Sequence, residues 1–225
     1  MLFRSVKQST FENKIFEDED AVFFDADGDG DQDLYVCSGG NEISSEPQSL
    51  LDRLYINDGK GNFSYSKNSI PARFQNSSCV AAGDFDGDKD TDLLIGSRLK
   101  GNQYGQPADG IILQNDGKGK FTDITSSVAP ELKGIGMITD GEWFDYDSDG
   151  KLDFMLCGEF MPITIFHNNG TTFSNFTNIT GLGETSGWWN TISLADINKD
   201  GLLTRIRKQS ESRKDRKSER EFPYE

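Results

Sequence analysis

Aspartates recur at alternate positions in four short stretches, and these residues are the ones most able to do chemistry. The stretches are DADGDGDQD at 25–33, DFDGDKDTD at 84–92, DYDSDGKLD at 145–153 and DINKDGLLT at 196–204. Carboxylates about 5 Å apart repel by roughly 3 kcal/mol per pair at an effective dielectric of about 20. A hard divalent cation removes this repulsion, and Ca²⁺ accepts the roughly seven oxygens that such a loop offers. We therefore predict calcium binding; Mg²⁺ suits the loops less, because it demands stricter octahedral geometry.

The position of a residue in its acidic loop predicts whether it is a ligand. In loops of this type the side chains at positions 1, 3, 5 and 9 face the ion, and position 7 offers its backbone carbonyl. The first three sites are then Asp25, Asp27, Asp29 and Asp33 with the carbonyl of Asp31; Asp84, Asp86, Asp88 and Asp92 with the carbonyl of Asp90; and Asp145, Asp147, Asp149 and Asp153 with the carbonyl of Lys151. The fourth offers Asp196, Asn198 and Asp200, with Thr204 where an aspartate is expected.

Position 6 of each loop requires a sharp turn. Gly30, Gly150 and Gly201 stand there in three loops, and glycine adopts positive φ without steric cost. Lys89 holds this position in the second loop, with Gly87 two places earlier. We therefore expect slight strain in the second site.

An EF-hand is the competing interpretation of these loops. It requires a bidentate Glu at position 12 and a helix on each side. Position 12 is held here by Val36, Ile95, Leu156 and Arg207, and the flanking sequences are of β type. The other alternative is a solvated acidic loop that binds no metal. The four periodic copies of the loop argue against it.

The loops are part of a longer repeat. They begin at Asp25, Asp84, Asp145 and Asp196, in steps of 59, 61 and 51 residues. A second motif keeps step: YINDGKGNF at 55–63, LQNDGKGKF at 113–121 and FHNNGTTF at 166–173 each carry an Asn-Asp-Gly or Asn-Asn-Gly hairpin signal. Short apolar runs flank every loop, so one unit reads as strand, acidic loop, strand, connection, strand, turn, strand. This is the unit of a four-stranded β-propeller blade.

Composition restricts the partners. The net charge of −15 argues against nucleic acid and anionic membranes. No apolar span of 18 residues exists, and the start MLFRSVKQSTFENK lacks the apolar core of a signal peptide. The widely spaced Cys37, Cys79 and Cys157 are predicted to be buried free thiols, and His167 is not predicted to be a ligand or a catalytic residue.

The sequence resembles the FG-GAP or VCBS repeat proteins, including integrin α-chain propellers and the bacterial relatives of cartilage acidic protein that carry an ASPIC/UnbV domain. The resemblance covers about residues 19–203 and is carried by FFDADGDGDQDLYV, AGDFDGDKDTDLLIG, WFDYDSDGKLDFML, SLADINKDGLL and the Asn-Gly turns. It implies an all-β fold, a partial propeller with Ca²⁺ in hairpin loops on one face. It also implies an extracellular or cell-envelope location and binding to other proteins or carbohydrate. No ASPIC/UnbV domain is present in this sequence, and no function is inferred from one.

Both ends depart from the repeat. Residues 1–18 are predicted to be the end of a preceding blade or an extension, 19–203 to be three blades and the first hairpin of a fourth, and 204–225 a charged tail, disordered or produced by a reading-frame change. Propellers usually close with four to eight blades. The remaining blades are therefore expected in another chain or in a longer protein.

The predicted function is binding. In an up-and-down blade the acidic loops and Asn-Gly turns emerge on one face, and the connections 39–51 and 96–110 emerge on the other, where we expect a protein or carbohydrate ligand; Arg98, Lys100 and Tyr104 lie in the second. Trp143, Trp188 and Trp189 are expected to pack between blades rather than to stack on sugars. Alternatives are the propeller of a secreted hydrolase or lyase, or a truncated fragment without independent function. No nucleophile motif supports an enzyme.

Overall fold

The protein is built from antiparallel β-sheets. Its structure is a computed structural model that describes residues 8–12, 15–40, 47–101, 103–196 and 204–209. Within these ranges the helical segments are single turns, η1 (Ser9–Phe11), η2 (Pro47–Leu50), α1 (Thr125–Val128) and η3 (Pro130–Leu132). None of the described helices has the length and apolar character needed to cross a bilayer. The predicted all-β class is confirmed.

The described strands form three four-stranded meanders and a hairpin, in chain order, and the hairpin pairs with the third meander through β13 and β10. The first blade is β1 (Asp18–Phe24), β2 (Asp33–Ser38), β3 (Arg53–Asn57) and β4 (Phe63–Tyr65). The second is β5 (Asn76–Gly83), β6 (Asp92–Leu99), β7 (Gly110–Asn115) and β8 (Phe121–Asp123). The third is β9 (Met137–Phe144), β10 (Asp153–Met161), β11 (Thr164–Asn168) and β12 (Phe173–Asn175), and the hairpin is β13 (Gly187–Ala195) with β14 (Thr204–Gln209).

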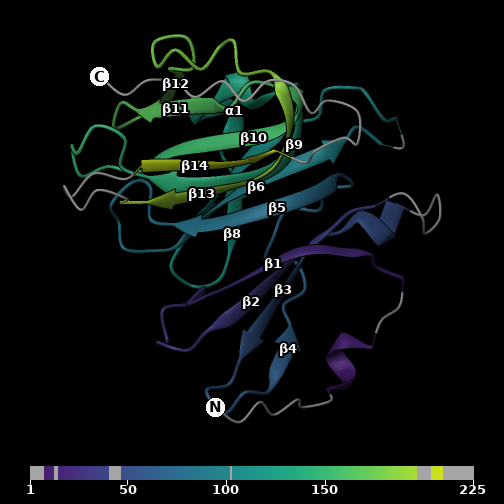
Figure 1. The fold of residues 1–225 in the computed structure, drawn as a ribbon. Coiled ribbons are helices and arrows are strands. Elements are labelled where there is room, and N and C mark those ends of the chain that lie inside the picture. The colour runs from purple at the N-terminus through teal and green to yellow at the C-terminus, as the bar shows by residue number, and fades with distance from the viewer. Residues whose placement is uncertain (1–7, 13–14, 41–46, 102, 197–203, 210–225) are drawn as a thin grey trace.

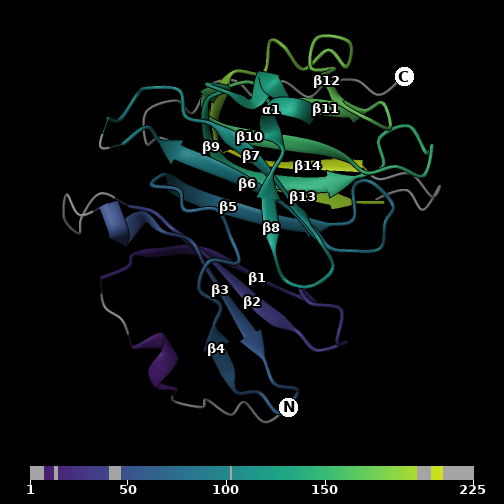
Figure 2. The ribbon, with the colours of Figure 1, turned by 180° about the vertical axis from the view of Figure 1, so that it is seen from behind.

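The blades are arranged as consecutive sectors of a propeller. Each blade is a simple meander in which every strand pairs with the next along the chain. The first strands of the blades, β1, β5, β9 and β13, lie next to one another in that order. The first blade lies below the others in Figure 1, and the view from behind shows the same succession (Figure 2). This is the geometry of a partial propeller, as predicted.

Apolar side chains fill the spaces between blades. Phe24, Tyr35 and Leu54 of the first blade pack against Leu93 and Leu113 of the second. A second cluster joins the second and third blades and includes Leu94, Ile112, Ile138, Phe154 and Phe166. Each fully buried side chain of this size contributes about 1.5–3 kcal/mol. The apolar runs that flank the acidic loops in the sequence therefore pack between neighbouring blades.

The tryptophans divide between two environments. Trp143 stacks on Phe85 of the preceding blade at a centroid distance of 6.0 Å and donates a hydrogen bond to the Ala81 carbonyl (3.1 Å). Trp189 is buried beside the third blade. Both confirm the predicted packing role, but that prediction is wrong for Trp188, which is exposed. Cys37, Cys79 and Cys157 are buried free thiols, as predicted.

Aspartates on the innermost strands add polar links between blades. Asp20 of β1 accepts a hydrogen bond from the Val80 amide of β5 (2.9 Å). Asp140 of β9 accepts from the Ile192 amide of β13 (2.7 Å). Each link joins one inner strand to the next, so neighbouring blades are fixed in rotation as well as packed together.

The structure describes a short segment near each end of the repeat. Near the start, the Gln8 side chain donates to the Gly61 carbonyl (2.7 Å) and accepts from the Phe63 amide (2.8 Å), so this segment lies on the outer strand of the first blade. Near the end, Thr204–Gln209 forms β14, which pairs with β13. The fourth hairpin therefore includes six residues assigned above to the tail, because backbone pairing overrides their charged composition. The rest of the predicted tail, 210–225, lies outside the described residues.

Candidate metal centre

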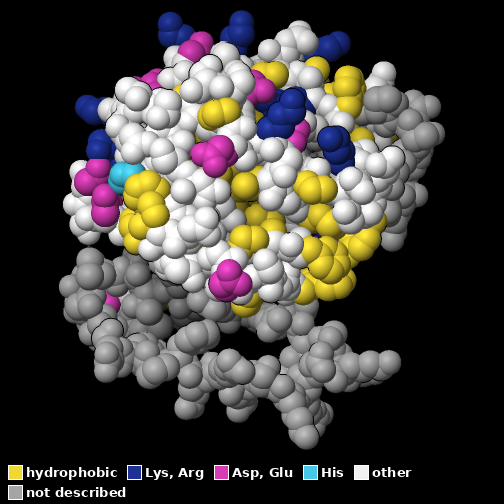
Figure 3. Space-filling model, turned by 90° about the horizontal axis from the view of Figure 1, so that it is seen from above, with side chains coloured by type: hydrophobic (Ala, Val, Ile, Leu, Met, Phe, Trp, Pro, Cys, Tyr) yellow, Lys and Arg dark blue, Asp and Glu magenta, His cyan; other side chains and the backbone are white. Residues whose placement is uncertain are grey.

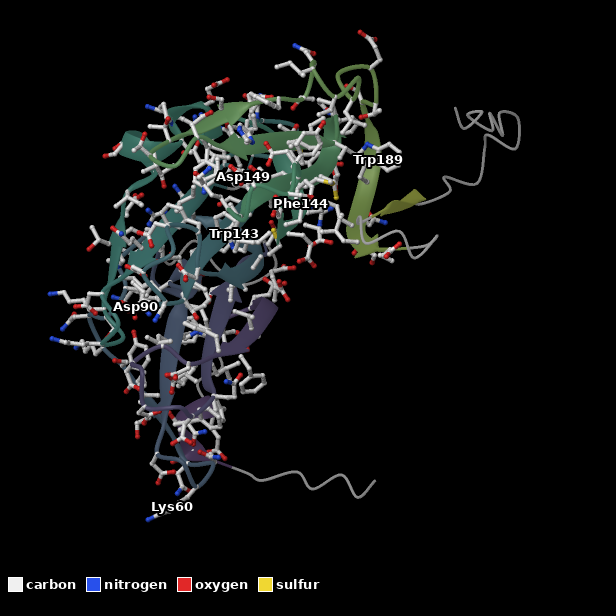
Figure 4. The ribbon with its side chains drawn as sticks, turned by 90° about the vertical axis from the view of Figure 1, so that its left-hand side faces the viewer. Lys60, Asp90, Trp143, Phe144, Asp149 and Trp189 are labelled. Atoms are coloured by element: carbon white, nitrogen blue, oxygen red, sulfur yellow. The ribbon has the colours of Figure 1, made fainter. Side chains whose placement is uncertain are left out.

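The acidic loops and the Asn-Gly turns lie on one face of the protein. The loops connect the first and second strands of each blade, and the turns connect the third and fourth. Figure 4 looks onto this face and shows Lys60 of the first turn, Asp90 of the second loop and Asp149 of the third in successive blades. The regular meander thus brings together loop and turn residues that are 15 to 24 positions apart in sequence.

In each loop the carboxylate of the aspartate at position 1 accepts hydrogen bonds from two backbone amides of the same loop. Asp25 accepts hydrogen bonds from the Gly28 and Gly30 amides (2.8 and 2.9 Å). Asp84 repeats this with Gly87 and Lys89 (2.8 and 3.0 Å). Asp145 accepts from Asp149 and Gly150 (3.2 and 2.9 Å). The position-6 amide thus donates to the position-1 aspartate in all three loops, whereas the second donor is at position 4 in the first two loops and at position 5 in the third.

The aspartate at position 9 joins each loop to its turn. Asp33, Asp92 and Asp153 are each 0% exposed. In every case one carboxylate oxygen accepts a hydrogen bond from the backbone amide at loop position 2, and the other accepts one from the backbone amide of the turn asparagine. The loop contacts are Ala26 (2.8 Å), Phe85 (3.3 Å) and Tyr146 (2.6 Å), and the turn contacts are Asn57 (2.8 Å), Asn115 (2.9 Å) and Asn168 (2.6 Å).

The turn asparagines also connect blades. The Asn115 side-chain amide donates to the Ala26 carbonyl of the first loop (2.9 Å). The Asn168 amide donates in the same way to the Phe85 carbonyl of the second loop (2.9 Å). The sequence indicated these residues only as turn formers. Their recurrence in steps of 58 and 53 residues, close to the loop steps of 59 and 61, was the signal that could have revealed this contact.

Side chains at position 7 face the turns. A Cβ atom added to Gly59 would lie 2.4 Å from Asp31 Oδ2, and one added to Gly117 would lie 2.5 Å from Asp90 Oδ2. Both glycines have positive φ, 71° and 68°. The turn glycine is therefore needed both for its positive φ and because the position-7 carboxylate lies too close for a Cβ atom. Since the position-7 side chain points at the turn, this residue would offer an ion its backbone carbonyl and not its carboxylate.

Carboxylate oxygens converge within each loop. Ligand atoms lie within 4.8 Å of one another for Asp25, Asp27 and Asp29, for Asp84, Asp86 and Asp92, and for Asp145, Asp147 and Asp149. Asp27 Oδ1 is buried, and no described residue donates a hydrogen bond to it. Oxygen-only donors and an unpaired buried carboxylate oxygen fit a hard cation such as Ca²⁺. Of the ligands predicted in the fourth loop, only Asp196 is described; Asn198, Asp200 and Gly201 lie outside the described residues, and Thr204, at position 9, begins β14.

Two further side chains approach the loops. Gln114 Nε2 donates to Asp86 Oδ2 (2.7 Å). His167 Nδ1 lies 3.1 Å from Asp153 Oδ1 and 3.8 Å from Asp147 Oδ2, so its ring nitrogen groups with these carboxylates as a possible ligand set. Figure 3 shows the histidine at the surface beside acidic side chains. Each residue immediately precedes a turn asparagine. Gln114 is not among the residues singled out from the sequence, and His167 was expected not to be a ligand.

Burial and like charge raise the pKa values of several loop carboxyls. Burial raises the pKa of Asp92 to about 7, although the amides of Asn115 and Phe85 oppose the shift. Burial also raises the pKa of Asp33 and Asp153. For Asp27, burial and the neighbouring Asp29 raise the pKa. The fold thus holds carboxylates where their ionisation is unfavourable without a compensating cation.

Strain occurs where the sequence predicted it. Gly30 and Gly150 have φ values of 90° and 86° at position 6, and Lys89 adopts 78° at the same position. Position 4 is also left-handed, with Gly28 at 78°, Gly87 at 80° and Ser148 at 63°. The second loop therefore contains a lysine in a conformation that disfavours residues with a Cβ atom.

The FG-GAP-like repeat family profile matches residues 25–95 and 145–203. These two segments contain three of the acidic loops completely and most of the fourth. A search of curated proteins finds no match.

Replacing Asp92 by Asn should destabilise the metal-free protein by about 1–3 kcal/mol at about pH 5, below the Asp92 pKa of about 7, because the Asn NH2 group cannot accept a hydrogen bond and would face one of the two backbone donors, Phe85 or Asn115. Urea unfolding with a chelator present measures this. The matched control is Asp88→Asn in the same loop, where the exposed side chain keeps an acceptor for the Asp90 amide. Equal stability of the two variants would contradict the role given to position 9.

The metal-free protein should lose stability as the pH rises from about 4 to about 7. The pKa of Asp92 is higher in the folded state than in the unfolded chain, so its contribution is present at low pH and lost as the folded carboxyl ionises. Asp52 is buried at the blade end opposite the acidic loops, and burial raises its pKa to about 6, so its ionisation lowers the stability over the same pH interval. Chelator-treated wild type should lose more stability over this interval than Asp92→Asn, as measured by urea unfolding; identical slopes would contradict the assignment.

Replacing Lys89 by Gly should stabilise the protein by about 0.5–1 kcal/mol, because relief of left-handed strain exceeds the entropy cost of glycine. Lys118→Gly is the control, since Lys118 is exposed in the adjacent turn and has no positive φ. The control should be neutral or slightly destabilised in chemical denaturation. Stabilisation of both variants alike would exclude strain at position 89 as the cause.

Proposed function

The chain belongs to the FG-GAP-like repeat family, and from that premise we propose that it is a calcium-stabilised β-propeller module that binds a partner on the face opposite its acidic loops. The observation that carries the calcium part is the repetition of one loop geometry in three blades, each with converging carboxylates and a buried aspartate at position 9. A cation would offset the charge that burial and repulsion make unfavourable.

The residues that would hold the ions are those at positions 1, 3, 5 and 9, with the carbonyl at position 7. In the third loop His167 is close enough to Asp147 and Asp153 to take part. Bound Ca²⁺ would supply electrostatic neutralisation and rigidity rather than reactivity. The position-9 aspartates already have each oxygen occupied by a backbone donor, so they hold the loop ready for the ion.

Extracellular use is part of this proposal. Extracellular calcium modules bind with dissociation constants of about 10⁻⁴–10⁻³ M, which suits loops that are largely exposed. The family resemblance supports the same location. A binding rather than a catalytic role is favoured because the carboxylates of the acidic loops are used in backbone contacts and candidate ion sites.

The face opposite the loops supports the binding part. A cavity of about 250 Å³ opens there, where the inner strands β1 and β5 begin. Its lining includes Glu17, Glu19, Asn76, Arg98 and Tyr104. Arg98 and Tyr104 belong to the connection in which the sequence predicted recognition.

Calcium should raise the melting temperature relative to chelator, because a ligand that binds only the folded state stabilises it. Differential scanning calorimetry with Ca²⁺, Mg²⁺ and chelator measures the effect, and Mg²⁺ should give the smaller shift. Asp86→Asn, which removes an exposed ligand charge from the second loop, should reduce the calcium shift. A melting temperature unaffected by Ca²⁺ would refute the metal proposal.

A further inference from the structure

The third acidic loop differs from the first two because a nitrogen ligand lies beside it. His167, the single histidine of the chain, precedes the turn asparagine of the third blade, where Ile56 and Gln114 stand in the first and second blades. Pairing of β10 with β11 brings its ring to the loop, with Nδ1 3.1 Å from Asp153 Oδ1 and 3.8 Å from Asp147 Oδ2. One ligand atom from each of these three side chains lies within 4.8 Å of the others. Among the three described loops, this one therefore combines carboxylate oxygens with an imidazole nitrogen.

Packing holds the imidazole ring in this position. The ring stacks on Phe176, with the ring centroids 4.7 Å apart and the planes inclined at 30°. The side chain of His167 is 15% exposed and that of Asp153 is 1% exposed, whereas that of Asp147 is 42% exposed. Two of the three ligands are thus fixed before an ion arrives, and the third leaves the group open to solvent (Figure 3). A ligand set fixed in advance loses little conformational entropy on binding.

A lysine makes the third loop less suited to calcium than the other two. Position 7 is held by Asp31 and Asp90 in the first two loops and by Lys151 in the third. The Lys151 ammonium group forms an ion pair with Asp149, the ligand predicted at position 5. The third loop thus has four carboxylates where each of the others has five, and one of the four is already paired with a cation. Calcium affinity depends on the number of charged ligands, so the affinity should be lowest here.

The donor atoms of this group favour a transition-metal ion. Ca²⁺ takes oxygen ligands, whereas imidazole nitrogen suits ions such as Zn²⁺, Cu²⁺ and Ni²⁺. Zinc bonds of about 2.0–2.2 Å to nitrogen and oxygen place the ligand atoms of a tetrahedral site about 3.4 Å apart. The distances from His167 Nδ1 to the two carboxylate oxygens, 3.1 and 3.8 Å, lie on either side of this value. Three protein ligands leave the fourth tetrahedral position for water.

We propose that Asp147, Asp153 and His167 bind a divalent transition-metal ion, with Zn²⁺ as the type, more tightly than the third loop binds Ca²⁺. This inference rests on the proposed function, because it takes the third loop to be a metal site, and it names the class of metal that this loop selects. When no such ion is present, the loop remains available to Ca²⁺. The first two loops have no histidine beside them and keep their preference for Ca²⁺.

Nitrogen NMR of the single histidine tests this inference directly. The full chain is labelled with ¹⁵N at histidine, and long-range ¹H–¹⁵N spectra are recorded at constant pH with chelator, with millimolar Ca²⁺, and with millimolar Ca²⁺ plus equimolar Zn²⁺. Zn²⁺ should shift the Nδ1 resonance and fix the tautomer that carries its proton on Nε2, whereas Ca²⁺ alone should not move Nδ1 comparably. An Nδ1 resonance that Zn²⁺ leaves in place would overturn the inference and leave His167 only its contact with Asp153.

His167→Gln is the matched variant, because glutamine already stands at the equivalent position 114 of the second blade. In isothermal titration calorimetry it should bind Zn²⁺ at least about tenfold more weakly than wild type, since even groups that only orient a metal ligand contribute about that much. Asn178→Ala, an exposed residue in the connection after β12, is the control and should bind Zn²⁺ as wild type does. Undiminished Zn²⁺ affinity in His167→Gln would overturn the inference.

The calcium response separates this inference from the proposed function. The calcium-induced rise in melting temperature should persist in His167→Gln, because the first two loops still bind Ca²⁺, and its persistence also shows that the variant is folded. If Ca²⁺ raises the melting temperature of wild type but Zn²⁺ does not reach His167, only the present inference fails. If Zn²⁺ shifts the His167 resonance but Ca²⁺ has no effect on melting, only the calcium part of the proposed function fails.

Discussion

The fold depends on a buried carboxylate with two backbone donors, repeated at position 9 of each described loop. A fully buried carboxylate is costly unless its oxygens are satisfied. Asp92 meets this requirement by accepting from Phe85 in its own loop and from Asn115 across the blade. The first strand pair and the second strand pair are thereby joined at one end of the meander. The acidic loop and the Asn-Gly turn recur together because one carboxylate requires both.

The same contact connects blades to one another. Asn115 is held by Asp92 through its backbone, so its side chain is positioned to reach Ala26 in the preceding blade. On the inner strands Asp20 and Asp140 make the corresponding links toward the following blade. These polar contacts surround apolar inter-blade cores and fix their rotation. Ion binding at the loops would therefore stabilise contacts between blades as well as the loops themselves.

The sequence predicts most of this architecture because the residues that repeat are those required by the backbone geometry of the loops and turns. Aspartate spacing, the glycine at position 6 and the Asn-Gly turns each follow from backbone geometry that neighbouring residues impose. Features that depend on tertiary contacts were missed. Thr204–Gln209 is charged yet forms β14, because β13 offers pairing partners. Trp188 is exposed because successive residues of β13 point to opposite faces and Trp189 takes the buried one. His167 approaches Asp153 only through strand pairing, a contact that leaves no periodic signal in the sequence.

The central claim is that the three described loops are ion sites completed by the fold, and ion stoichiometry tests it most directly. Equilibrium dialysis against radioactive calcium should find at least about three ions per folded chain, with Asp92→Asn losing one. The same protein unfolded in urea should bind none with comparable affinity, because the carboxylates converge only when loop and turn are joined. Fewer than one ion per folded chain at millimolar calcium, or equal binding by folded and unfolded protein, would contradict the account.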